Sequence, residues 1–325
     1  MEQVACDLCG CADAVVVTRQ TDILHRTTEE FFTIVRCSGC GLQYVNPRPS
    51  REEIGRYYAD HYSFHDAPSR IRLLISDIMD RLANSPLYWL FSWIPHVDRK
   101  LAIRIKPDLQ DPVLQYLRTG ARLGILDIGC GAGASAHFWG PTGALQSYKK
   151  LAPVFGVEVD DDARRALEKN GIRAYPSLDS VPADDSFDII RMNWSLEHVH
   201  SPAEYFAFIA AHLDAAGKAI IAVPNYDGVL YRLANDCVEL PIHLYHFRRQ
   251  DIAAYAEKNG LRVIEFTSFS YPEMFVVAAQ ACRSLRGSFD SGLGTSEARA
   301  MQQTLSRLDR LGLGNNMLFV LEKAA

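Results

Sequence analysis

From about residue 122 to its end, the chain alternates short apolar runs with segments that carry apolar residues at helical spacing. Apolar runs of about four to eight residues between turn signals are typical of buried strands. The runs predict seven strands, at residues 124–128, 154–158, from 172, 186–192, 218–223, 261–269 and 315–322. Strands that alternate with helices indicate an α/β protein with a doubly wound, Rossmann-like sheet.

Helix signals fill the intervals between these strands. The segments concerned are residues 134–139, 163–169, 202–213 and 251–258. Ser201-Pro-Ala-Glu204 has the sequence of a capping box with proline at the first helical position. Gly140-Pro-Thr-Gly143 should end the first helix near Trp139. A helical insertion is expected at residues 279–311, whose arginines either meet an anionic acceptor or lie in solvent.

The N-terminal segment carries two Cys-x-x-Cys pairs, each followed by glycine. Four thiolates are the ligand set of tetrahedral structural zinc, and the absence of a secretory signal favours metal over disulfides. The apolar runs Ala14–Thr18 and Phe31–Val35 predict strands of a ribbon that needs the metal as its core. The alternative is four free thiols, and Cys11 is interpreted as a bystander. The predicted zinc ligands are Cys6, Cys9, Cys37 and Cys40.

Three domains follow from these patterns: a zinc ribbon at 1–50, a helical connector or lid at 51–118, and an α/β domain at 119–325. Asn46-Pro-Arg-Pro49 marks the first boundary, because its prolines interrupt regular structure. Ser50 is a candidate N-cap for a helix that begins at Arg51. The aromatic segment 87–94 is open to four interpretations: core packing, an oligomer contact, a substrate lid or contact with a membrane surface.

Composition and charge exclude several classes of protein. With 48% hydrophobic residues among 325, the chain is typical of globular proteins rather than disordered ones. A net charge of −5 argues against a sequence-independent nucleic-acid binder. The longest apolar stretch, Pro86–Ile94, is far shorter than the roughly 18 residues of a membrane span. We therefore expect a cytoplasmic enzyme.

The turn after the first strand of the α/β region is rich in glycine, which lets the backbone approach a ligand closely. This loop alone also fits the relaxed pattern of dinucleotide-binding enzymes. Asp127, just before the loop, argues against a dinucleotide, since a carboxylate attracts a ligand ammonium but repels a pyrophosphate. Glu158 ends the second strand, where an acid can accept the hydroxyls of a ribose. The loop glycines are Gly129, Gly131 and Gly133.

Several motifs in order resemble those of class I S-adenosylmethionine-dependent methyltransferases over residues 119–325. They are Leu126-Asp-Ile-Gly-Cys-Gly-Ala-Gly133, Gly156-Val-Glu158, Phe187-Asp-Ile-Ile, Glu197-His-Val and Gly217-Lys-Ala-Ile-Ile-Ala-Val-Pro-Asn225. The N-terminal knuckles, followed by Asn46-Pro-Arg-Pro49 and Tyr57-Tyr58-x-x-x-Tyr62, resemble those of bacterial methyltransferases that act on sugars and related small metabolites. Deoxysugar C-methyltransferases are similar only in part, because they carry a further C-terminal domain.

The resemblance implies S-adenosylmethionine as cofactor and assigns roles to residues. Asp127 would meet the amino group of the methionine part, and Glu158 would hold the ribose. The glycine loop would pass under the carboxylate and ribose. Asn193 or Trp194, after the fourth strand, would face the methionine or the adenine; both also fit a role in loop geometry and packing.

Methyl transfer to a hydroxyl or acidic carbon requires removal of a proton, which suits histidine near neutral pH. His198 is one candidate base, with Glu197 beside it to orient or charge its partner. His243 and His246, after the fifth strand, are the others. Each also fits a structural role. Some quinone-ring O-methyltransferases hold a metal with a Glu-x-x-Glu-His motif; here Trp194 replaces the first carboxylate and argues against a catalytic metal, although Glu197 and His198 leave one open.

The sequence therefore predicts a methyltransferase that O- or C-methylates a small molecule, with a sugar, a glycan-related compound or a secondary metabolite as acceptor. An RNA base methyltransferase also fits a zinc ribbon before this fold, but the acidic pI of about 6.1 counts against it. A non-catalytic scaffold and an NAD-dependent oxidoreductase are the remaining alternatives. Intact Asp127 and Glu158 argue against the scaffold.

Overall fold

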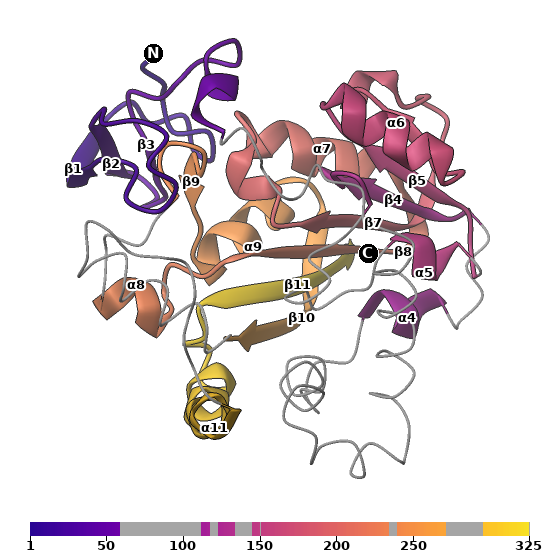
Figure 1. The fold of residues 1–325 in the computed structure, drawn as a ribbon. Coiled ribbons are helices and arrows are strands. Elements are labelled where there is room, and N and C mark those ends of the chain that lie inside the picture. Colours follow the sequence, from indigo (N-terminus) through magenta and orange to yellow (C-terminus); the bar gives the residue numbers. More distant parts are fainter. Residues whose placement is uncertain are drawn as a thin grey trace.

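The computed structural model describes residues 1–58, 112–117, 123–133, 145–149, 151–233, 239–270 and 295–324. Within them, a seven-stranded sheet forms the centre of the molecule and a four-stranded sheet stands beside it (Figure 1). The expected connector at 51–118 is described only at its two ends, and the aromatic segment 87–94 and the expected helix at 134–139 lie outside the described residues.

The large sheet has the order β10-β11-β8-β7-β4-β5-β6. Its strands are β4 (Ile125–Ile128), β5 (Val154–Val157), β6 (Arg173–Tyr175), β7 (Phe187–Asn193), β8 (Leu213–Pro224), β10 (Leu261–Phe269) and β11 (Asn316–Lys323). Strands β6, β5, β4, β7 and β8 run parallel, and β11 is antiparallel to both of its neighbours. The predicted doubly wound, Rossmann-like fold is confirmed. Strand β8 begins at Leu213, five residues earlier than expected.

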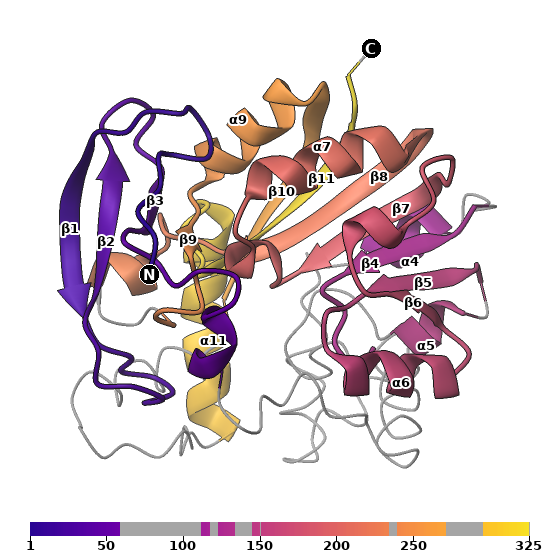
Figure 2. The same ribbon diagram turned by 90° about the horizontal axis from the view of Figure 1, so that it is seen from above.

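Alternating side chains of the sheet supply two separate cores, because successive residues of a strand point to opposite faces. Ile189 of β7 packs in one core, whereas Ile190 packs in the other. Helices α4 (Pro112–Leu117), α5 (Leu145–Tyr148) and α6 (Asp161–Lys169) cover the Ile189 face. Helices α7 (Pro202–His212) and α9 (Arg249–Lys258) cover the other face (Figure 2). Both faces are therefore covered, as a doubly wound sheet requires.

The small sheet combines the N-terminal segment with a strand from the far end of the chain. Its strands are β1 (Ala14–Gln20), β2 (Phe32–Cys37), β3 (Gln43–Val45) and β9 (Tyr245–His246), all antiparallel in that order. Gln43 pairs with His246 and Tyr44 with Tyr245. The two expected ribbon strands are confirmed, while β9 joins from a segment that the sequence did not assign to the ribbon. Figure 1 shows β9 directly beside β3.

The ribbon is also attached to the α/β region by Asp7. Its carboxylate accepts hydrogen bonds from Ser201 Oγ at 2.7 Å and from the Ala203 backbone N–H at 2.9 Å, at the N-terminus of α7. The Tyr255 hydroxyl donates to the same carboxylate at 2.8 Å. A carboxylate at a helix N-terminus meets free N–H groups and the positive end of the helix dipole. This contact fixes the ribbon against α7 and α9.

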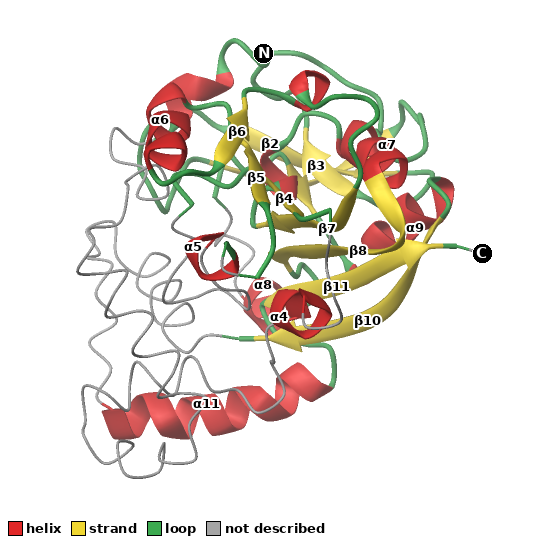
Figure 3. Cartoon of the chain, turned by 90° about the vertical axis from the view of Figure 1, so that its right-hand side faces the viewer, coloured by secondary structure: helices red, strands yellow, loops and turns green. Residues whose placement is uncertain are grey.

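One local expectation changes. The helix expected from Arg51 is only a short 3-10 turn, η1 (Ile54–Tyr57). Gly55 lies inside this segment and lowers its helix propensity, because glycine costs about 1 kcal/mol relative to alanine in a helix interior. The expected helical insertion does contain a helix, α11 (Thr295–Arg310), which contacts β10 and extends away from the sheet (Figure 3). None of the described helices is long and apolar enough to cross a lipid bilayer.

Candidate functional site

The glycine loop after β4 has a backbone that other residues adopt poorly. Gly129, Gly131 and Gly133 have φ angles of +72°, +52° and +76°. A Cβ atom on Gly129 would lie 2.5 Å from Cβ of Ser195, and one on Gly133 would lie 2.7 Å from Leu167. Glycine is thus required both for the turn and for the close approach of neighbouring segments.

Glu158 folds back onto this loop from the end of β5. Its Oε2 accepts a hydrogen bond from the Gly131 N–H at 2.7 Å, and its Oε1 accepts one from the Asp160 N–H at 2.9 Å. The side chain is 5% exposed. Asp160 itself caps α6, since its Oδ1 accepts from the Ala163 N–H at 2.7 Å. The predicted ribose-binding acid therefore lies beside the glycine loop.

Asp127 has a partner that the sequence analysis did not identify. Arg191 lies opposite it on the neighbouring strand β7 and donates to Oδ1 from Nε at 2.8 Å and to Oδ2 from Nη2. Both side chains are almost completely buried. The only signal in the sequence was an arginine between the apolar residues Ile190 and Met192 of a predicted strand. Asp127 therefore carries a bidentate ion pair in addition to any role toward a ligand.

Asn193 and Trp194 occupy the end of β7 and the residue after it. Asn193 Oδ1 is buried without a hydrogen-bond partner among the described residues. Trp194 has a φ of +51°, and its Nε1 donates to Asn316 Oδ1 at 3.0 Å. Its ring packs edge-on against Phe269 at 6.1 Å. These contacts attach Trp194 to the sheet and leave Asn193 as the residue with an unused polar atom.

Glu197, His198 and His243 gather at the carboxyl end of β7. Glu197 and His198 belong to the 3-10 turn η3 (Leu196–His198), and His243 comes from the loop before β9. Glu197 is 1% exposed, and neither carboxylate oxygen has a hydrogen-bond partner among the described residues. His243 Nε2 lies 4.0 Å from Glu197 Oε1, and the two imidazole rings meet edge-on at 4.6 Å. The structure thus brings together three of the four predicted catalytic residues.

Two further residues extend this group, Glu239 and His25. Glu239 Oε2 lies 2.9 Å from His25 Nε2 and 3.7 Å from His243 Nε2. His25 comes from the loop between β1 and β2, so the ribbon contributes to the group. Glu239 stands four residues before His243, but nothing local in the sequence pointed to His25. We name the five residues the histidine–glutamate cluster: His25, Glu197, His198, Glu239 and His243.

Burial controls the protonation of the cluster. It lowers the pKa of His198 to about 3 and also lowers that of His243, while it raises the pKa of Glu197 well above its usual range. Burial raises the pKa of Glu239 too, but the charges of His243 and His25 and the hydrogen bond from His25 outweigh it, and the pKa falls to about 2. His198 is therefore neutral near pH 7, with a lone pair that can bind a metal or accept a hydrogen bond.

His246 lies apart from the cluster. It is fully buried within β9, and its two ring nitrogens have no hydrogen-bond partner among the described residues. Its ring packs against that of Tyr226 at a centroid distance of 4.4 Å. Burial lowers its pKa well below the usual value. These contacts are those of a core side chain.

The four predicted zinc ligands converge at one end of the ribbon. Their sulfur atoms all lie within 4.8 Å of one another, with Cys6 and Cys40 at 3.5 Å and Cys9 and Cys37 at 3.5 Å. Four sulfurs about 2.3 Å from one zinc ion lie roughly 3.8 Å apart in a tetrahedron, which these distances match closely. Cys11 is not part of the group, and its Sγ contacts the Asp13 carbonyl at 3.6 Å.

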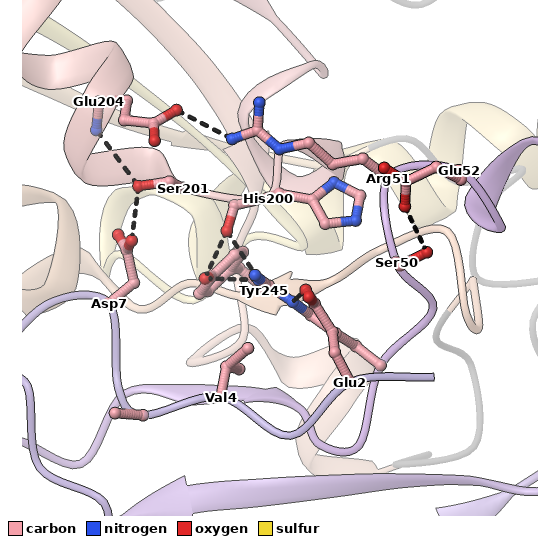
Figure 4. A pocket seen from close by; sticks show the side chains of 12 residues that line it. Glu2, Val4, Asp7, Ser50, Arg51, Glu52, His200, Ser201, Glu204 and Tyr245 are labelled. Carbon is pink, nitrogen blue, oxygen red and sulfur yellow. Dashed lines mark hydrogen bonds and ion pairs between the residues drawn. The ribbon is translucent and has the colours of Figure 1, made fainter.

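A pocket of about 400 Å³ lies where the ribbon meets the segment between β7 and α7 (Figure 4). Arg48 closes it on one side, where it donates to the His200 carbonyl at 2.7 Å and pairs with Glu2 at 2.8 Å. Asp7 with Ser201 and Arg51 with Glu204 form further contacts around it. Among the described residues, neither the glycine loop nor the histidine–glutamate cluster lines this pocket. It is therefore separate from both the glycine loop and the cluster.

Comparison with known families identifies the class of this protein. A family model described as a methyltransferase domain matches residues 98–266, more than half of the chain. The chain belongs to the class I S-adenosylmethionine-dependent methyltransferases, as its motifs indicated. It is thus an enzyme that uses S-adenosylmethionine.

Solved structures of similar fold are also methyltransferases. An S-adenosylmethionine-dependent methyltransferase from Archaeoglobus fulgidus is 20% identical, with 73% of this chain and 99% of the other covered at a TM-score of 0.44. The O-methyltransferase of a trans-AT PKS multienzyme from Brevibacillus brevis, in complex with S-adenosyl-L-homocysteine, is 15% identical. The alignment covers 76% of this chain and 80% of the other, with a TM-score of 0.43.

A chain of the complex between the Haloferax volcanii Trm112 methyltransferase activator and a methyltransferase is also 15% identical. The alignment covers 76% of this chain and 98% of that chain, with a TM-score of 0.45. A search of curated protein sequences returns no significant match.

Proposed function

We propose that this enzyme methylates an oxygen or carbon atom of a small molecule, and that the acceptor is a sugar, a glycan-related compound or a secondary metabolite. The observation that carries the proposal is the histidine–glutamate cluster at the carboxyl end of β7, partly enclosed by the ribbon. Ligands of open α/β sheets bind at this edge. An enclosed group of histidines and carboxylates suits the binding and orientation of a small polar acceptor.

The cluster lies close to the proposed cofactor position. Ser195, two residues before Glu197, donates to the Ile128 carbonyl at 2.7 Å and packs against Gly129. Burial raises the pKa of Tyr58, and the charges of Glu197, Glu239 and Glu158 raise it further. Tyr58 itself lies 3.3 Å from His198 Nδ1.

We assign the cofactor contacts as follows. Glu158 exchanges its bonds to the loop for the ribose hydroxyls, and Asp127, held by Arg191, faces the methionine ammonium. Asn193 offers its unpartnered oxygen to the cofactor, and Trp194 maintains the shape of the adjacent turn. The glycines at 129, 131 and 133 allow the backbone to approach the cofactor closely.

The ribbon is proposed to hold one structural zinc ion through Cys6, Cys9, Cys37 and Cys40. All four positions of a tetrahedral ion are then taken by protein, which suits structure rather than catalysis. Reduced thiols require a reducing compartment, which supports a cytoplasmic location. We retain the three-part division at residues 50 and 118, with the ribbon shaping access to the acceptor site.

The test is methyl transfer from labelled S-adenosylmethionine to a panel of sugars, nucleotide sugars and phenolic or polyketide metabolites, with product mass measured. Addition of one methyl group to a small molecule supports the proposal. A salt-sensitive gel shift with RNA and label incorporated into RNA bases would replace it with an RNA substrate. Binding of S-adenosylhomocysteine, but no turnover on either panel, would favour a scaffold. A melting temperature that rises with S-adenosylhomocysteine but not with NADH would exclude an NAD-dependent oxidoreductase.

A further inference from the structure

We propose that the histidine–glutamate cluster is a metal site, in which Glu197, His198 and His243 bind one divalent transition-metal ion and the Glu239 carboxylate lies beside them. The site would be distinct from the four cysteines. The geometry of the cluster supports the binding of the ion by itself. Only the role of the ion, which is to bind the acceptor oxygen, rests on the proposed function.

The distances within the cluster fit an ion better than hydrogen bonds. Glu197, His198 and His243 each offer a ligand atom, and these three atoms lie within 4.8 Å of one another. His243 Nε2 is 4.0 Å from Glu197 and 3.7 Å from Glu239, which is too long for direct hydrogen bonds. Two ligands about 2.0–2.2 Å from one ion are at most about 4.4 Å apart, so movements of some tenths of an ångström would complete the site.

The unpartnered carboxylate of Glu197 is the second observation. Both of its oxygens are buried without a hydrogen-bond partner among the described residues. A buried polar group left in this state costs free energy, and a buried carboxylate costs more than a neutral group. An ion held between Glu197 and the two imidazoles would compensate this cost and explain why the carboxylate points into the cluster.

Hydrogen bonds around the cluster hold its ligands in the form that binds a metal. His198 Nδ1 lies 3.0 Å from the Ile242 carbonyl, which can only accept, so Nδ1 carries the proton and Nε2 keeps its lone pair. A second hydrogen bond of this kind is typical of histidines that bind metals. His25, at 2.9 Å from Glu239, supports that carboxylate in the same way from the ribbon.

The ligand types indicate the class of ion. Two imidazoles with one or two carboxylates suit zinc, manganese or iron(II), whereas magnesium and calcium prefer oxygen ligands alone. The ion would take a hydroxyl oxygen of the acceptor as a further ligand and lower its pKa. The proton then passes to water, the oxygen forms a bond to the methyl carbon, and the electrons of the broken S–C bond remain on sulfur as S-adenosylhomocysteine. The preferred acceptor is thus a hydroxyl compound.

Metal counting tests the proposal without relying on activity. The full chain is dialysed against micromolar zinc, washed and analysed for zinc per chain. We expect two equivalents in the wild type, and one in both Glu197→Gln and His243→Gln. His212→Gln is the matched control, because this buried histidine lies away from the cluster, where it contacts the Asp185 carbonyl at 2.7 Å and stacks on Phe208. It should keep both equivalents.

Cobalt(II) added to metal-free protein identifies the two sites by their spectra. The cysteine site should give an intense thiolate charge-transfer band, and a second equivalent should add weaker bands that disappear in His243→Gln. A wild type that holds only one equivalent, or a second equivalent that persists in the Glu197→Gln, His243→Gln double variant, overturns the metal site. Binding of S-adenosylhomocysteine is measured on the same samples, so that a failure of the proposed function is recognised separately from a failure of the metal site.

Discussion

Asp127 and Arg191 are register partners on the adjacent parallel strands β4 and β7, and their side chains form a bidentate ion pair inside the protein. Asp127 is the acid that precedes the glycine loop, so the pair connects the proposed ammonium contact to the strand that leads into Glu197 and His198. The ring of Tyr148 lies 5.6 Å from the Arg191 guanidinium and covers it. The residue that we assign to the cofactor is therefore also part of the core.

Substitution of Asp127 should consequently affect stability as well as binding. We expect Asp127→Asn to lower the free energy of unfolding by roughly 3–5 kcal/mol, because it leaves the Arg191 charge buried without its counter-charge. Urea denaturation measures this effect. The exposed Asp179→Asn is the control and should be neutral. The combined Asp127→Leu, Arg191→Met variant should recover much of the stability and bind the cofactor weakly. An Asp127→Asn protein with wild-type stability would contradict this view of the pair.

Glu158→Ala should weaken the binding of S-adenosylhomocysteine and should destabilise the fold less than Asp127→Asn does. Hydrogen bonds to a charged group contribute about 1.5–3 kcal/mol, which corresponds to roughly a 10–150-fold loss of affinity. Calorimetry on the folded variant gives the dissociation constant, and Glu168→Ala, on the exposed side of α6, serves as the comparison. If both variants bind as tightly as the wild type, the ribose is not held by Glu158.

Loss of one cysteine should remove zinc from the ribbon. Cys37→Ser should abolish the thiolate-bound equivalent, because the tetrahedral set is incomplete, whereas Cys11→Ser should retain it. The ribbon shares a sheet with β9, so we also expect the Cys37→Ser protein to lose methyl transfer. Elemental analysis and the cobalt thiolate band provide the measurement. Thiolate-bound metal that persists in Cys37→Ser would remove this residue from the ligand set.

Substitution of His198, His243 and His246 should distinguish histidines that act in catalysis from one that only stabilises the fold. His198→Ala and His243→Ala should slow single-turnover methyl transfer by ~10²–10⁴-fold, whether the ring removes a proton or holds the ion. His246→Ala should instead lower the melting temperature and leave the chemical step of the folded fraction nearly unchanged, because its contacts are those of the core. Wild-type rates in all three folded variants would exclude histidine catalysis and leave alignment of the acceptor as the mechanism.

Local sequence determined most of the α/β architecture. The apolar runs from Ile125 to Lys323 predicted all seven strands of the large sheet, because a buried strand needs only its own apolar side chains to be recognised. The glycine loop was predictable for a similar reason, since positive φ angles at Gly129, Gly131 and Gly133 restrict the residue type directly. The two Cys-x-x-Cys pairs likewise encode the geometry of their knuckles within a few residues.

Contacts between distant segments were decided by tertiary structure alone. Arg191 meets Asp127 because the sheet order places β7 beside β4, although 64 residues separate them in the chain. Glu239 lies between His25 and His243 because the loop before β9 packs against the ribbon. No local pattern encodes such pairs, since they depend on which strands become neighbours and which faces are buried together. The sequence therefore determined the parts of the cofactor site, whereas the packing of the ribbon on the α/β domain assembled the histidine–glutamate cluster.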